Sequence, residues 1–217
     1  MEQVNLTGDQ QIVLDHFRKH PNFPKLFYFT GGTALAIYYY HHRLSVDLDF
    51  FSEKKFSARS VNMFIASLEK KFGWKWTLRQ PDENILVYTA DTSDGLLKID
   101  FNFYPYKRLN MGKIIDGIDV DSLQDIAANK LLTINQRSDV KDFVDLYYLL
   151  KDFTVWDLMY AVEAKFRFKL DPVMVAADFL KIEQFDILPK MKKPLTLAKL
   201  TTFYKKQARV LGSSFIR

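Results

Sequence analysis

Two aspartates, Asp47 and Asp49, lie two residues apart in a short and otherwise apolar stretch. Residues 46–51 alternate between apolar and acidic side chains, which is typical of a β-strand with one buried face. Side chains i and i+2 of a strand project from the same face, so the two carboxylates would lie side by side. Such a pair is costly without a counter-charge, and a divalent cation such as Mg²⁺, which prefers oxygen ligands, removes that cost. The pattern therefore predicts a cation site.

A third carboxylate, Asp100, has similar surroundings, because Ile99 and Phe101 flank it. If this strand pairs beside residues 46–51, Asp100 completes a cluster of three carboxylates. Such a cluster can hold two metal ions about 3.5–4 Å apart, and this geometry stabilises both the attacking and the leaving oxygen of an in-line displacement. Lys98 would share the face of Asp100 and could be a charge partner rather than a catalyst.

A glycine turn, Gly31-Gly32-Thr33, follows the aromatic run 26–30, which we interpret as a strand. Glycines let the backbone approach a phosphate, and the amides at the start of a helix attract negative charge. A Gly-Gly turn alone is more often only a flexible helix start, and an Asp-x-Asp pair alone often serves solubility. Together and in this order, with carboxylates set among apolar residues where free charges are costly, the motifs favour phosphate chemistry.

The composition fits a globular protein and sets limits on its function. The chain has 217 residues, 48% of them hydrophobic, with 15% aromatic residues that we assign to a bulky core. It has no cysteine, which excludes disulfides and thiolate zinc sites and favours a cytoplasmic location. Residues 1–5 lack the layout of a signal peptide. No apolar run approaches the roughly 20 residues that span a membrane.

The pattern changes near residue 120, from alternating strands and helices to helices alone. We therefore expect an α+β fold with an N-terminal domain over residues 1–118, in which helices flank a mixed sheet, and a helical C-terminal domain over residues 119–217. The helices expected before residue 120 are 7–20, 33–42 and 57–72, and the strands are 26–30, 46–51, 74–79, 84–90 and 96–104, with a hairpin turn at 92–95. The later helices begin near Ser122, Ser138, Thr154, Asp171 and Leu195.

The motifs resemble those of the AbiEii/AbiGii toxin family, which belongs to the polymerase-β-like nucleotidyltransferase superfamily. Residues 29–36 and 43–51 carry the likeness at the glycine turn and the Asp-x-Asp strand, and residues 98–101 are similar to the third-carboxylate strand. Residues 122–130 resemble the family's lysine-bearing helix, and residues 137–147 its Arg and Asp-x-x-Asp-Leu helix. The resemblance covers about residues 26–150. The superfamily favours Gly-Ser at the turn, where this chain has Gly-Gly-Thr.

The resemblance implies an N-terminal nucleotidyltransferase domain that transfers a nucleoside monophosphate from an NTP to an acceptor. Asp47, Asp49 and Asp100 would bind Mg²⁺ (or Mn²⁺), and Asp100 would help to deprotonate the attacking hydroxyl. Lys130 is similar to the lysine that contacts the triphosphate, and Asp142 matches the late acidic residue. The implied catalytic residues are Asp47, Asp49, Asp100, Lys130 and Asp142, and the implied nucleotide-binding residues are Gly31, Gly32, Thr33, Arg43, Ser45 and Lys130.

The resemblance also suggests partners: an NTP, tRNA or another RNA as the acceptor, and a cognate antitoxin protein. A basic segment, residues 190–209, holds seven Lys and Arg and no Asp or Glu, and the chain carries a net charge of +5. It could bind RNA, or it could be an ordinary solvated helix face. Two alternatives stay open: a nucleotidyltransferase that modifies a small molecule or a protein, and a non-catalytic nucleotide- or RNA-binding module.

Several side chains near these motifs have two interpretations. Arg43 could neutralise a phosphate or balance Asp47 or Asp49. Asp142 and Asp145 would be neighbours on a helix, and one of them could be structural. We favour Asp142 as the functional residue, and we interpret the adjacent His41 and His42, at the end of the expected helix 33–42, as a solvated helix end.

Overall fold

The computed structural model describes residues 6–213, so residues 1–5, to which the signal-peptide expectation refers, lie outside the described part. Contacts divide the chain into two compact units. We call the first the sheet unit; its described residues are 6–39, 45–107 and 111–122. We call the second the helical unit; its described residues are 40–44, 108–110 and 123–213. The architecture confirms the α+β class.

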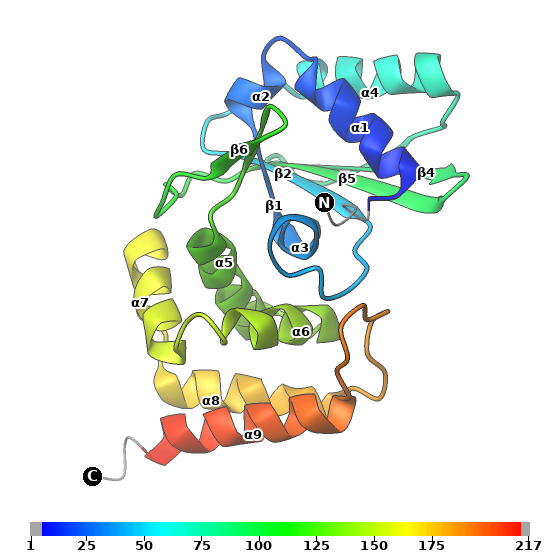
Figure 1. Ribbon diagram of the computed structural model, residues 1–217. Coiled ribbons are helices and arrows are strands. Elements are labelled where there is room, and N and C mark those ends of the chain that lie inside the picture. Colours follow the sequence, from blue (N-terminus) through cyan, green and yellow to red (C-terminus); the bar gives the residue numbers. More distant parts are fainter. Residues whose placement is uncertain (1–5, 214–217) are drawn as a thin grey trace. The chain divides into compact units, whose positions relative to one another are not determined.

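The sheet unit is built on a mixed sheet with the strand order β3-β4-β5-β2-β1-β7-β6 (Figure 1). Its strands are β1 Tyr28–Thr30, β2 Asp47–Ser52, β3 Thr77–Asp82, β4 Ile85–Thr92, β5 Gly95–Phe103, β6 Lys113–Ile115 and β7 Ile118–Val120. The pairs β2·β5 and β1·β7 are parallel, and the others are antiparallel. The predicted β4–β5 hairpin is confirmed. The β6–β7 hairpin had not been predicted.

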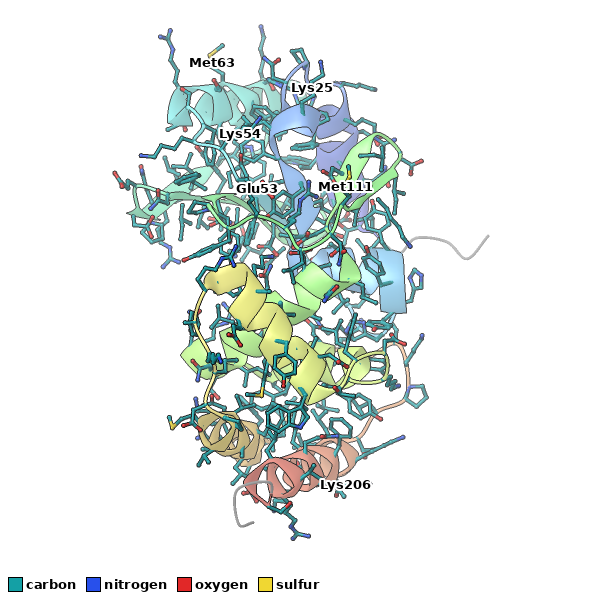
Figure 2. All side chains as sticks on the ribbon, turned by 90° about the vertical axis from the view of Figure 1, so that its left-hand side faces the viewer. Lys25, Glu53, Lys54, Met63, Met111 and Lys206 are labelled. Atoms are coloured by element: carbon teal, nitrogen blue, oxygen red, sulfur yellow. The ribbon has the colours of Figure 1, made fainter. Side chains whose placement is uncertain are left out.

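Three helices cover one face of this sheet: α1 Gly8–Arg18, α2 Phe23–Leu26 and α4 Ala58–Phe72. In Figure 1, α1 and α4 lie on the same side of the sheet. Beneath them Phe50 stacks on Phe17, with ring centroids 4.2 Å apart, and on Phe101, with centroids 5.3 Å apart. All three rings are fully buried, whereas Met63 on the outer side of α4 points to solvent (Figure 2). Much of the aromatic content of the chain therefore builds this core, as predicted.

The opposite side of the sheet carries α3 Gly31–Leu35 (Figure 1). A π-helical turn, η1 Ala36–Tyr40, continues it, where a single α-helix over 33–42 had been expected. His41 then takes a left-handed conformation, with φ of 50°, which ends the helix. The helix expected from residue 7, by contrast, begins there, and Thr7 forms a capping box with Gln10 at the start of α1.

The helical unit contains α5 Leu123–Gln136, α6 Val140–Leu149, α7 Val155–Phe166, α8 Pro172–Leu180, η2 Lys181–Gln184 and α9 Leu197–Ser213. Its core surrounds Tyr204, whose ring packs against Phe143 and Phe179 and whose hydroxyl donates to the Phe143 carbonyl at 2.6 Å. Thr154 caps α7 as predicted. The cap of α6 is Asp139 and not Ser138, because the Asp139 carboxylate accepts from the Lys141 amide. Of the helices in residues 6–213, none is both long and apolar enough to cross a bilayer.

Candidate functional site

The register of two parallel strands brings the predicted carboxylates together. On β2 and β5, Asp49 is paired with Asp100, and Asp47 is paired with Lys98. Paired residues of neighbouring strands point to the same face, so these four side chains share the face opposite the aromatic core. The expected pairing of the two acidic strands is thus confirmed. Leu48, between the two aspartates, and Phe50, directly after them, are fully buried in the core and hold β2 in this register.

Lys98 supplies a counter-charge to these carboxylates. Its Nζ lies 2.7 Å from Asp100 Oδ2 and 3.9 Å from Asp47 Oδ2. Burial acts to lower the pKa of Lys98, but the hydrogen bond to Asp100 and the nearby carboxylate charges raise it above its ordinary value. The ammonium group therefore keeps its proton, which agrees with its interpretation as a charge partner.

The Asp100 side chain is more enclosed than that of Asp47, with 14% of it exposed against 33%. Burial raises the pKa of its carboxyl group, and the neighbouring Lys98 offsets this only in part. Its Oδ2 receives the Lys98 hydrogen bond, whereas its Oδ1 is buried and has no hydrogen-bond partner within the described part of the chain. A buried acceptor without a donor is costly, so this oxygen is available to a cation or to a proton.

Gly31 is required by both its backbone and its surroundings. It has a φ of +77°, which favours glycine, and a Cβ atom at this position would lie 2.1 Å from Asp49 Oδ2. The glycine turn and the Asp-x-Asp strand are therefore in direct contact, because the Asp49 carboxylate lies against the Gly31 backbone. Neither motif alone predicts this contact.

We predict that Gly31→Ala displaces the Asp49 carboxylate and lowers any activity that depends on it by at least about tenfold, because the methyl group and the carboxylate cannot share the same space. Gly73→Ala is the matched control. Gly73 ends α4 with a φ of +76°, so alanine carries the same backbone strain of about 1–2 kcal/mol, but nothing lies within 4 Å of its added methyl group. Thermal unfolding and activity are measured for both variants. Equal activity in the two would show that only backbone strain matters.

The hydroxyls of Thr33 and Ser45 bind each other. Thr33 Oγ1 donates to Ser45 Oγ at 2.8 Å, and Thr33 is fully buried whereas Ser45 is half-buried. The Ser45 carbonyl in turn accepts from the Gln10 side chain of α1 at 3.1 Å. The structure thus ties the start of α3 to the residues that lead into β2, and of the two hydroxyls that of Ser45 is nearer to solvent.

The other predicted residues meet in the helical unit around Asp145, which is fully buried on α6. Arg43 binds its carboxylate in a bidentate manner at 2.7 and 2.8 Å, and Lys130 of α5 lies 2.7 Å from Oδ2. Burial alone would raise the pKa of Asp145, but these two cations hold it well below its ordinary value. Arg43, which had been expected to meet a phosphate or balance Asp47 or Asp49, has Asp145 as its partner.

Lys130 also joins Asp142 to this cluster. Its Nζ donates to Asp142 Oδ1 at 2.7 Å, and Asp142 Oδ2 accepts from Arg137 at 2.9 Å. Both Lys130 and Asp142 are buried. Both oxygens of the Asp142 carboxylate are thus bound within the protein, Oδ1 by Lys130 and Oδ2 by Arg137. The central position of Asp145 was not recognised, although it is the second aspartate of the Asp-x-x-Asp helix.

The interpretation of His42 as a solvated helix end is wrong. Its side chain is fully buried, and its Nε2 lies 2.8 Å from Asp145 Oδ1. Burial is the largest influence on its pKa and lowers it, so the imidazole is neutral near pH 7. Nε2 then carries the proton toward Asp145, and Nδ1 is a buried acceptor without a partner among the described residues. A local sequence pattern could not show this, because the partner lies about a hundred residues away.

The three sheet-unit carboxylates fit a hard divalent cation. All their donors are oxygens, Asp49 and Asp100 are paired across neighbouring strands, and Asp100 Oδ1 is a buried acceptor without a donor. Within residues 6–213, no three His, Asp or Glu side chains are already arranged around one point as a metal site. Cation binding would therefore require these carboxylates to move toward one another, with Asp100 Oδ1 free to take part while Oδ2 keeps Lys98.

Comparison with known proteins agrees with this arrangement. Residues 12–209 match the family described as nucleotidyl transferase AbiEii toxin, type IV toxin–antitoxin system. The uncharacterized protein aq_aa25 of Aquifex aeolicus (strain VF5) is 39% identical over 136 residues, which is 61% of each chain. The fold is similar to JHP933 from Helicobacter pylori, with a TM-score of 0.59, 18% identity and coverage of 94% of this chain and 89% of that one.

The fold is also similar to MenT4, the nucleotidyltransferase toxin Rv2826c from Mycobacterium tuberculosis H37Rv. The TM-score is 0.50 at 15% identity, and the match covers 86% of this chain and 75% of that one. At such identities the solved structures show the fold alone. The family match, in contrast, spans most of the chain and includes the glycine turn, the three carboxylates and the Asp145 cluster. The chain belongs to the AbiEii family of nucleotidyltransferase toxins of type IV toxin–antitoxin systems.

Proposed function

We propose that this protein transfers a nucleoside monophosphate from an NTP to an RNA acceptor, with release of pyrophosphate, as the toxin of a toxin–antitoxin pair. The observation that carries the proposal is the parallel β2·β5 register, which sets Asp49 beside Asp100 and directly against the Gly31 turn. Neither a solubility role nor a core role accounts for an uncompensated carboxylate oxygen buried on Asp100. A protein antitoxin that restrains the activity is the second partner that the family implies.

In this proposal Asp47, Asp49 and Asp100 would hold Mg²⁺ or Mn²⁺, which supplies charge neutralisation at the triphosphate and at the attacking oxygen. The backbone at Gly31-Gly32-Thr33 and the Ser45 hydroxyl bind the β- and γ-phosphates. Asp100 Oδ1 accepts the proton of the attacking RNA hydroxyl. The position of this oxygen supports the role, because it is buried and has no hydrogen-bond donor among the described residues.

Arg43, Lys130 and Asp142 have a different role in this proposal. Their charges are already neutralised within the buried Asp145 cluster. We assign them to positioning, through the segment 40–44 that connects η1 to β2, rather than to direct contact with the triphosphate. This departs from what the family resemblance implies for Lys130.

The test is incubation of the protein with each of the four labelled NTPs, Mg²⁺ and total tRNA, followed by separation of RNA, protein and small molecules. We expect label in RNA and a requirement for the divalent cation. Label in a protein or a small molecule instead would replace the acceptor in the proposal. No transfer to any acceptor, with NTP still bound, would favour a non-catalytic binding module.

A further inference from the structure

Lysines gather on one surface of the helical unit. Residues 190–193, which we call the strap, run beside residues 42–44: the Leu44 amide donates to the Lys190 carbonyl at 2.9 Å, and the amides of Lys192 and Lys193 donate to the His42 carbonyl at 2.8 and 3.1 Å. The strap backbone is therefore fixed by the same segment that the Asp145 cluster holds. We define the lysine cluster as Lys151, just after α6, Lys192 and Lys193 of the strap, and Lys199 in the first turn of α9.

Lys151 lies close enough to Lys193 and Lys199 for their charges to repel, and Lys192 follows in the same strap. The ammonium group of Lys151 lies over the ring of Tyr148, 4.2 Å from its centroid, and 5.0 Å from that of Tyr147. Burial lowers the pKa of Lys151, and the charges of Lys199 and Lys193 lower it further, with only Asp152 acting in the opposite direction. The four side chains are exposed.

Little negative charge compensates the lysine cluster: of the groups that act on the pKa of Lys151, Asp152 is acidic and Lys199 and Lys193 are basic. Over residues 6–213, none of the four ammonium groups forms an ion pair with a carboxylate, whereas Lys205 of the same basic segment pairs with Glu183. The first turn of α9 contains Lys199 and no acidic residue, which is the reverse of the arrangement that stabilises a helix. The arrangement is unfavourable in the isolated protein and becomes favourable against a polyanion.

The surroundings favour RNA over a protein as that polyanion. Protein interfaces have an apolar core, whereas the described residues 147–152 and 190–199 include no exposed large apolar side chain, and Leu44 beside the strap is 36% exposed. Exposed lysines on flexible stems suit phosphates at variable spacing. We propose that the lysine cluster binds the phosphate backbone of the RNA acceptor. That the acceptor is RNA rests on the proposed function, whereas the place where it binds is inferred from the lysine cluster.

The test compares two quadruple variants with the same change in charge. In the first, Lys151, Lys192, Lys193 and Lys199 are changed to Gln. In the control, Lys19, Lys25, Lys70 and Lys71 are changed to Gln; these four are exposed on or beside the helices that cover the opposite, aromatic face of the sheet. Binding of labelled total tRNA is followed by fluorescence anisotropy over a range of KCl concentrations, and far-UV circular dichroism checks that both variants are folded.

We expect the negative slope of log K, the association constant for tRNA, against log [KCl] to become shallower by about 3 in the cluster variant, because each lost phosphate contact removes about 0.7–0.9 from its magnitude. We also expect the affinity of this variant for tRNA to fall more than tenfold. In transfer assays its kcat at saturating RNA stays unchanged and its KM for RNA rises. In the control variant we expect the slope of log K against log [KCl] to stay close to that of the wild type. Equal losses of affinity and of salt dependence in the two variants would show that only the net charge of the protein matters, and would overturn the proposal.

Three further outcomes separate this inference from the proposed function. If the wild type transfers nucleotide to RNA but the cluster variant keeps the KM and the salt slope, the surface is wrong and the function stands. If the wild type modifies only protein or a small molecule, the proposed acceptor is wrong. If the cluster variant binds tRNA normally but loses affinity for the antitoxin, the surface belongs to a protein and the RNA assignment is overturned.

Discussion

Asp49→Asn is expected to abolish nucleotidyl transfer without unfolding the protein. Asp49 is paired with Asp100 and lies against the Gly31 backbone, so it is the carboxylate at the meeting point of the two motifs. The neutral amide is a poor ligand for a hard cation, and a loss of roughly 4 kcal/mol of transition-state stabilisation lowers the rate about a thousandfold. The measurement is single-turnover transfer from labelled NTP with saturating Mg²⁺.

The stability of this variant distinguishes a functional carboxylate from a structural one. Asp49 lies among like charges, and its negative charge contributes to the raised pKa of Lys98. Removal of one charge from a group of carboxylates lowers their mutual repulsion, so we expect an unchanged or higher Tm. A structural aspartate would instead lower the Tm together with the activity.

Asp91→Asn is the matched control for this prediction. Asp91 lies on β4 of the same sheet, is exposed, and is paired with Leu96 near the hairpin end of β5. The same chemical change there should leave transfer and stability within experimental error. Transfer by Asp49→Asn within tenfold of the wild type would contradict the three-carboxylate site.

The elements that sequence reasoning predicted are those with local signals. Helices were expected to begin at Thr7 and Thr154, and in the structure each of these residues forms a capping box with the residue three positions later. The alternation of β2 and β5 was visible because one face of each strand is buried and the other is not. The β6–β7 hairpin was missed, since strands of three residues are too short to show a period.

In the candidate site, too, the features set by nearby residues could be predicted, and the contacts between residues far apart in the sequence could not. The shared face of Asp47 and Asp49 follows from spacing alone, and the pairing with Asp100 could be expected from a second strand of the same type. The contact of Asp49 with Gly31 could not, because it depends on where β1 ends relative to β2. His42 was misread for the same reason: its burial depends on Asp145, far along the chain.

The second large effect is expected at Asp145, where Asp145→Asn should lower the free energy of unfolding by about 3–5 kcal/mol. The substitution leaves two buried cations, Arg43 and Lys130, without the carboxylate that both contact at 2.7 Å, and an uncompensated buried charge costs energy in this range. Urea unfolding monitored by circular dichroism measures the loss. Asp186→Asn, an exposed aspartate of the same unit, is the control and should change stability by less than about 0.5 kcal/mol.

A double-mutant cycle tests whether the loss of stability comes from the interaction between Asp145 and Arg43. Arg43→Met removes the bidentate partner, so Asp145→Asn should cost less in that background than in the wild type, with a coupling energy of at least about 1 kcal/mol. Additive effects of the two substitutions would show that Arg43 and Asp145 do not stabilise each other.

The difference in unfolding free energy between the wild type and Asp145→Asn should depend on pH, because the ionised form of Asp145 is the stabilising one. The pKa of Asp145 is depressed in the folded protein, so its contribution is fully present above the unfolded value of about 3.8 and is lost as the pH falls below it. The gap in unfolding free energy between wild type and Asp145→Asn should therefore be constant near neutral pH and narrow progressively below about pH 3.8. A gap that stayed constant to low pH would mean that the shape of the side chain matters and its charge does not. A difference in unfolding free energy that narrows would show that the negative charge of Asp145 stabilises the protein. Because residues 42 and 43 contact this charge and the strap backbone binds residues 42–44, the same charge would help to hold the strap.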